Sequence, residues 1–264
     1  MTRYAFTTPD PVEVVVRNAA GEVELTCEET TNTDVVVEPR RSEDADLAER
    51  TTVVQEGDRL RIEVPEKRWG NSPEVTVRVT VPQGSRLVAR TASADVRCAG
   101  PLSALTVIAA SGDVAAGIVE GDVTVQSASG DVTLGIITGD ASVRTASGDV
   151  TAAKVGSLEV STASGDVTVG SVARAMQART ASGDVRLADV AAGSVEVNTA
   201  SGDIIVGVRR GTAVRLDLSS HSGDLRSELP VEETAPENGT ALDLRLYSLS
   251  GDIHVRRGAA ARAS

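Results

Sequence analysis

Aromatic side chains are almost missing from this chain, in which they make up 2% of 264 residues. Proteins that bind single-stranded nucleic acid stack its bases on aromatic side chains and hold its phosphates with basic ones. The chain has few aromatic side chains, and its 38 acidic side chains outnumber its 26 basic ones, which gives a net charge of −12. The same negative charge disfavours binding to anionic membrane surfaces. Composition therefore predicts no nucleic-acid partner and no membrane insertion, and it leaves an unknown protein as the partner.

Cysteine and histidine are equally scarce, with two of each. Cys27 and Cys98 have neither a metal-binding spacing nor a base at motif distance, so we expect two free thiols and no nucleophile. His221 and His254 lack a third ligand and are interpreted as surface residues. No apolar run approaches 18 residues, and the first ten residues lack the hydrophobic core of an export signal. We therefore predict a cytoplasmic protein.

One tripeptide is abundant instead. Ser-Gly-Asp occurs eight times, after a degenerate copy that begins at Ser93, and the serine-to-serine spacings are 18, 18, 18, 17, 18, 19, 21 and 28. A short fixed period is typical of a solenoid, whose repeats bury their apolar side chains only by stacking. We expect the regular copies to form a ladder of turns at Ser111-Gly112-Asp113, Ser129-Gly130-Asp131, Ser147-Gly148-Asp149, Ser164-Gly165-Asp166, Ser182-Gly183-Asp184 and Ser201-Gly202-Asp203.

Aliphatic residues occupy every second position on both sides of the tripeptide. Leu87 and Leu105 stand six residues before the serine, and Val96 and Val114 stand three after it. Such alternation predicts two half-buried strands joined by a tight corner. The predicted fold class is all-β: a single-stranded parallel β-helix, or β-solenoid, right-handed, with about 18 residues and two strands per coil. A coil with three six-residue faces also fits the period.

The predicted organisation is one continuous domain. Residues 1–90 alternate less regularly and are expected to form an irregular β cap and the first coils. Within them, residues 42–50 have a serine, early acids and a late arginine, which predicts a short helix with Ser42 as its N-cap. Residues 91–256 form the regular solenoid, interrupted by a loop insertion at 228–240, and residues 257–264 are a flexible tail.

The turn chemistry explains why the tripeptide recurs. Glycine permits the positive φ of a sharp corner, and serine and aspartate oxygens accept hydrogen bonds from amides that the corner leaves unpaired. Turn capping is thus the preferred role of the aspartates. Calcium binding by Asp113, Asp131, Asp149 and Asp166 is the alternative, because stacked carboxylates suit hard cations. The second half of each repeat is too irregular to supply a matching half-site.

The repeat T-A-S-G-D-V, the segment G-E-V-E-L near the N-terminus and the strand V-T-V-R-V-T-V-P-Q-G together resemble a bacterial β-strand-repeat family. That family is labelled "putative adhesin" and is otherwise a domain of unknown function. The resemblance covers nearly the whole chain. It implies a β-helical fold without established enzymatic residues, and the label implies surface display.

An enzyme is disfavoured by the residues themselves. Sugar-cleaving β-helical enzymes place acids or bases in a cleft, often beside aromatic platforms, whereas the acids here recur regularly in turns. We therefore predict no catalytic residue and no cofactor. The predicted function is a non-enzymatic scaffold or protein-binding module. One alternative is a filament that assembles through the solenoid ends, and another is a calcium-stabilised surface adhesion module.

Overall fold

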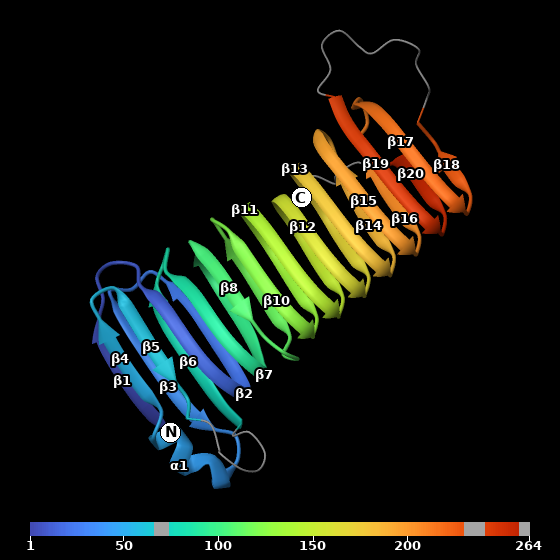
Figure 1. The fold of residues 1–264 in the computed structure, drawn as a ribbon. Coiled ribbons are helices and arrows are strands. Elements are labelled where there is room, and N and C mark those ends of the chain that lie inside the picture. The colour runs from blue at the N-terminus through green and yellow to red at the C-terminus, as the bar shows by residue number, and fades with distance from the viewer. Residues whose placement is uncertain (66–73, 230–240, 259–264) are drawn as a thin grey trace. The chain divides into compact units, whose positions relative to one another are not determined.

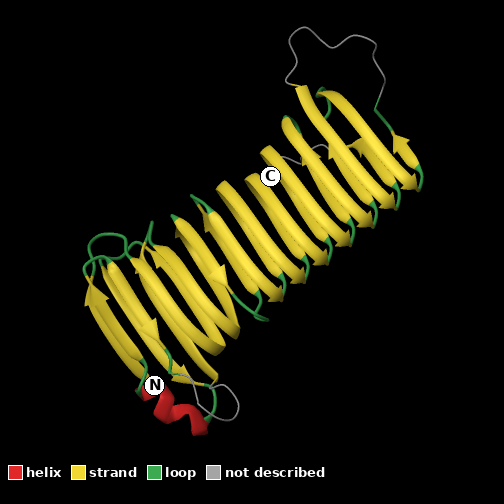
Figure 2. Cartoon of the chain, in the orientation of Figure 1, coloured by secondary structure: helices red, strands yellow, loops and turns green. Residues whose placement is uncertain are grey.

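The computed structural model describes residues 1–65, 74–229 and 241–258 (Figures 1 and 2). Strands dominate these residues, so the predicted all-β class is confirmed. The chain divides into two compact units, one formed by residues 1–139 and the other by residues 140–264. The division falls inside strand β11 (Val132–Ser147). Each unit is described by itself below.

The first unit holds the irregular N-terminal part and the first regular repeats. Its strands before β11 are β1 (Thr2–Thr7), β2 (Glu13–Glu28), β3 (Asn32–Pro39), β4 (Thr52–Glu56), β5 (Arg59–Glu63), β6 (Glu74–Pro82), β7 (Arg86–Leu102), β8 (Ala104–Ile108), β9 (Val114–Val119) and β10 (Val123–Ser129).

Strands of successive repeats in this unit pair in parallel, one repeat apart. On one side of the Ser-Gly-Asp corner, β7, β8 and β10 are neighbours, with Leu87 opposite Leu105 and Leu105 opposite Val123. On the other side, β7, β9 and β11 are neighbours, with Val96 opposite Val114. Equivalent side chains therefore stack in columns, as the alternation predicts.

The N-terminal strands do not follow chain order. Strand β2 pairs in parallel with β7 on one side and with both β5 and β6 on the other. The coil formed by β5 and β6 thus lies outside the earlier coil formed by β2. Beyond it the pairing becomes antiparallel: β3 runs against β6, β1 against β3, and β4 against β5 (Figure 1).

The second unit contains the remaining strands. Their bounds are β12 (Val150–Ser164), β13 (Val167–Ser182), β14 (Val185–Val190), β15 (Gly193–Ser201), β16 (Ile204–Val208), β17 (Ala213–Ser222), β18 (Leu225–Ser227), β19 (Ala241–Ser250) and β20 (Ile253–Arg257).

Chain order is broken here too. Strand β19 pairs in parallel with β15 on one side and β17 on the other, and β20 lies in the same way between β16 and β18. The last coil of the chain, β19 and β20, is therefore inserted between two earlier ones. The coil of β17 and β18 consequently forms the edge of this unit (Figure 1).

The columns of aliphatic residues form the core in both units. Leu87, Val125, Val150 and their equivalents are buried, apart from those in the coil of β17 and β18. Two strands per coil would require a second turn between one Ser-Gly-Asp corner and the next, but β12 and β13 each run on from corner to corner. A register shift between Val155 and Ser157 marks the place as a bulge in a continuous strand.

The predicted helix at 42–50 is confirmed as a 3₁₀ turn, Ser42–Asp44, followed by α1 (Ala45–Glu49). Ser42 is not the N-cap, because Arg41 occupies that position and makes no capping side-chain bond. No helix among the described residues is long and apolar enough to cross a membrane. The predicted loop insertion, apart from residues 228–229, and the tail from residue 259 lie outside the described residues.

Candidate functional site

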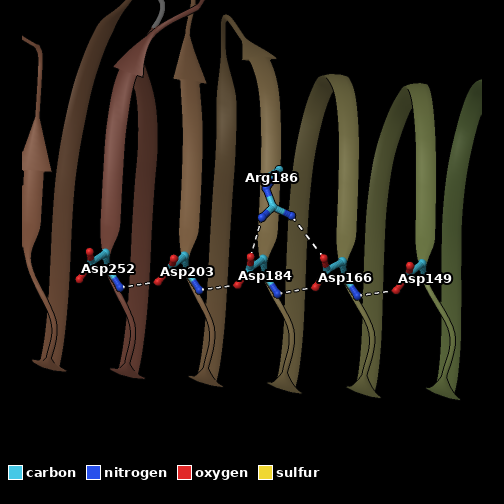
Figure 3. A network of polar contacts seen from close by, with 6 residues as sticks. All are labelled: Asp149, Asp166, Asp184, Arg186, Asp203 and Asp252. Atoms are coloured by element: carbon cyan, nitrogen blue, oxygen red, sulfur yellow. Dashed lines mark hydrogen bonds and ion pairs between the residues drawn. The ribbon is translucent and has the colours of Figure 1, made fainter.

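The aspartates of the tripeptide form a continuous ladder of hydrogen bonds in the second unit (Figure 3). Each backbone amide donates to the Oδ1 of the equivalent aspartate in the neighbouring coil. The N–O distance is 2.8 Å from Asp166 to Asp149, 2.9 Å from Asp184 to Asp166 and from Asp203 to Asp184, and 2.8 Å from Asp252 to Asp203. The carboxylates therefore satisfy amides that the corners would otherwise leave unpaired.

Glycine is required at these corners. Gly183 has a φ of +147°, and a Cβ placed on it would lie 2.1 Å from the carbonyl oxygen of Gly165. Its own amide donates to the carbonyl oxygen of Ser201, 3.0 Å away. Stacking thus brings one corner backbone directly against the next, which leaves no room for a side chain.

The first unit carries the same ladder over fewer steps. The amide of Asp113 donates to Asp95, and that of Asp131 donates to Asp113, at 3.1 and 2.9 Å. Arginines two residues after an aspartate neutralise part of the charge: Arg97 contacts Asp95 in this unit, and Arg186 contacts both Asp184 and Asp166 in the other. These pairs are exposed, so each stabilises the fold only slightly.

The ladder geometry suits turn capping directly. One oxygen each of Asp149, Asp166, Asp184 and Asp203 already accepts an amide. No group of three or more histidine, cysteine or acidic side chains among the described residues could hold a metal ion. The calcium site at Asp113, Asp131, Asp149 and Asp166 stays a prediction.

The two thiols are buried and free, and burial raises the pKa of Cys27 to about 11 and that of Cys98 to about 12. Both are therefore protonated near neutral pH.

The second unit also has a shallow groove of about 570 Å³, called here the Tyr247 groove. Two outward rows of side chains form its sides, and a row of buried hydroxyl residues runs between them. The rows cross β13, β15, β19 and β17 in that spatial order. They consist of Arg179, Asn198, Tyr247 and Ser219; Thr180, Thr199 and Ser248; and Ala200, Leu249 and His221.

The groove combines apolar and polar groups. Leu249 is 63% exposed although it is a large aliphatic residue. The Tyr247 hydroxyl donates to the Oδ2 of Asp217 at 2.5 Å, and this bond raises the pKa of Tyr247. The hydroxyl oxygens of Thr180 and Thr199 are buried and have no hydrogen-bond partner among the described residues. An apolar contact surface with a polar margin is typical of protein-binding sites.

Sequence reasoning missed this groove. Tyr247 lies on β19, which has a neighbouring strand on each side, and nothing in the residues around it predicts which strands these are. The available signal was the position before each turn serine. It is alanine in seven of the nine repeats, and only Leu249 and His221 depart from it. Of the two histidines, only His221 lines the groove, whereas His254 contacts Glu228.

Comparisons with known proteins agree with the resemblance found in the repeats. A family model described as "Toastrack DUF4097" matches residues 13–256. No curated protein matches. Among solved structures, a "putative adhesin" from Parabacteroides distasonis is 14% identical, with 96% of each chain covered and a TM-score of 0.46. Another from Parabacteroides merdae is 12% identical, with 96% of this chain and 95% of that one covered and a TM-score of 0.43.

Proposed function

We propose that this chain, which belongs to the Toastrack DUF4097 family, is a two-faced β-solenoid that acts as a non-enzymatic protein-binding module. The Tyr247 groove is its docking surface. The single observation that carries the proposal is the exposed Leu249 beside Tyr247, at a repeat position that is alanine in seven of the nine repeats. A family of adhesin-like proteins without a defined role is consistent with binding as the activity.

The residue types in the groove favour a peptide or protein surface. Tyrosine and arginine are enriched among the residues that dominate binding energies at protein interfaces. Tyr247 is held in place by its bond to Asp217, so little side-chain freedom is lost when a partner binds. Arg179 lies at one end of the groove and could receive a carboxylate, while Leu249 offers an apolar contact.

The binding role is tested with a displayed library of random peptides selected on the full chain. Selected peptides are then titrated against the wild type and against Leu249→Asp by fluorescence anisotropy. We expect Leu249→Asp to weaken binding at least tenfold, because the change places a charge where an apolar contact forms. Tyr247→Phe keeps the ring and removes only the bond to Asp217, so we expect a smaller loss.

Ala146→Asp is the matched control, since Ala146 occupies the same position of another repeat in the second unit and does not line the groove. It introduces the same charge and should leave binding unchanged. Peptides that bind the wild type and Leu249→Asp equally would show that the groove is not the docking surface. Failure to select any peptide would count against a peptide-binding role for this face.

A further inference from the structure

The edge coil of the second unit has unpaired strands. Within the described residues, β17 pairs only with β19 and β18 pairs only with β20. On the opposite side of each strand, the backbone amides and carbonyls therefore have no paired strand among the described residues. An edge of this kind is a template for pairing with another strand.

The interior of the coil is open at the same place. Leu216 and Leu218 belong to columns whose other members are buried, yet both are only partly buried. Leu225 is 48% exposed, whereas its neighbour Ile253 on β20 is fully buried. The described residues thus leave the apolar side chains of one coil uncovered along both of its strands.

The outer face of β17 carries charges that complement each other in an antiparallel self-pairing. In a register centred on Leu216, Val214 lies opposite Leu218 of the second copy. Arg215 then lies opposite the partner's Asp217, and Asp217 opposite the partner's Arg215. Arg215 makes no ion pair or side-chain hydrogen bond with the described residues, so it is available for this contact. Opposite charges directly across two strands stabilise their pairing.

We infer that two copies of this chain join through β17 in a closed, two-fold symmetric dimer, in which the apolar interiors meet at Leu216 and Leu225. The symmetry explains why one strand can supply both partners of each charge pair. The other described edge strands, β1 and β4, belong to antiparallel pairs and have no such repeat-like coil. Pairing through β17 alone therefore ends at two copies and gives no filament.

The test is the mass of the full chain by sedimentation over the micromolar range. The wild type should be a dimer that dissociates on dilution. Arg215→Asp faces the partner's Asp217 with a like charge, and Asp217→Arg does the same with Arg215. Each single variant should therefore be monomeric, while the double variant Arg215→Asp/Asp217→Arg restores opposite charges and should dimerise again. Circular dichroism confirms that each variant is folded.

Mixing the two single variants gives the sharpest readout. The variant Arg215→Asp carries two acids at positions 215 and 217, and Asp217→Arg carries two arginines there. The mixture should therefore form a heterodimer although each variant alone is monomeric. A monomeric wild type would overturn the inference and indicate that the chain covers its own edge. A dimer that ignores all charge reversals would place the interface elsewhere. Large species that grow with concentration would indicate a filament and overturn the closed dimer.

Discussion

The outermost parallel coils of the two units are built alike, but they differ in whether further strands cover them. In the first unit the coil of β5 and β6 lies outside the earlier coil of β2, and in the second unit the coil of β17 and β18 lies outside the later coil of β19 and β20. Leu60 and Leu216 occupy equivalent columns in these outer coils. Leu60 is 1% exposed, whereas Leu216 is only partly buried.

The difference lies in strand direction. Strands β3 and β4 run antiparallel to the outer coil of the first unit and cover it, and β1 extends the arrangement further. Ion pairs join β3 to the coils beneath it: Arg78 on β6 contacts Glu38 on β3 and Glu24 on β2, both at 2.6 Å. Antiparallel strands with charges on their outer face do not continue the repeat. The outer coil that antiparallel strands follow is thus covered, whereas the outer coil that keeps the parallel repeat pattern stays open to another strand.

The largest expected effect is a difference in the free energy of unfolding between Leu60→Ala and Leu216→Ala. Leu60→Ala removes a fully buried side chain and should lower the free energy of unfolding by about 2–5 kcal/mol. Leu216→Ala should cost clearly less, about 1 kcal/mol, because part of its surface already contacts solvent. Both changes are measured by urea unfolding in the Arg215→Asp background, so that no second copy covers Leu216. Equal losses would mean that both ends are covered to the same extent.

A smaller effect is expected along the aspartate ladder. Asp184 accepts the amide of Asp203 and contacts Arg186, whereas Asp224 at the edge coil contacts Arg226 and accepts no amide from another coil in the described residues. Asp184→Ala should cost about 1–2 kcal/mol because it leaves an amide unpaired. Asp224→Ala should stay within about 0.5 kcal/mol of the wild type.

The stability losses of Asp184→Ala and Asp224→Ala are compared by the same urea unfolding, and hydrogen exchange of the Asp203 amide gives a local readout. That amide should exchange faster in Asp184→Ala. Asp184→Asn is the matched control, since the side-chain oxygen of asparagine can still accept the bond. If Asp184→Ala and Asp224→Ala lowered the free energy of unfolding equally, the carboxylates would stabilise the fold through their charge and not through hydrogen bonds to amides.

The regular repeats could be predicted from the sequence because one chemical solution recurs. A glycine, an aspartate and alternating aliphatic residues specify each corner and its strands locally, and the columns around Val150 and Leu158 follow directly. The order of the coils could not be predicted. Nothing in residues 241–257 shows that they insert between two earlier coils, since their apolar pattern fits any neighbour. The groove at Tyr247 and Leu249 was missed for the same reason, because its rows depend on that order.

The smallest expected effect concerns acid and the closed end of the first unit. Glu13 on β2 contacts Arg59 on the outer coil at 2.7 Å and Arg86 on β7 at 3.5 Å. The hydrogen bond from Arg59 lowers the pKa of Glu13 below its ordinary value of 4.5. A carboxyl group with a lowered pKa in the folded state stabilises the fold fully above its unfolded pKa. That contribution is lost as the pH falls through the lowered value.

Glu13→Gln should therefore reduce the unfolding temperature by no more than a few degrees at neutral pH, and the gap to the wild type should close below pH 4.5. Thermal unfolding of both proteins at a series of pH values measures this gap. A gap that persists at the lowest pH would show that Glu13 acts through packing and not through its charge. Because Glu13 joins the outer coil to β7 across β2, losing its charge should loosen the closed end first, and hydrogen exchange in β5 would reveal that loosening.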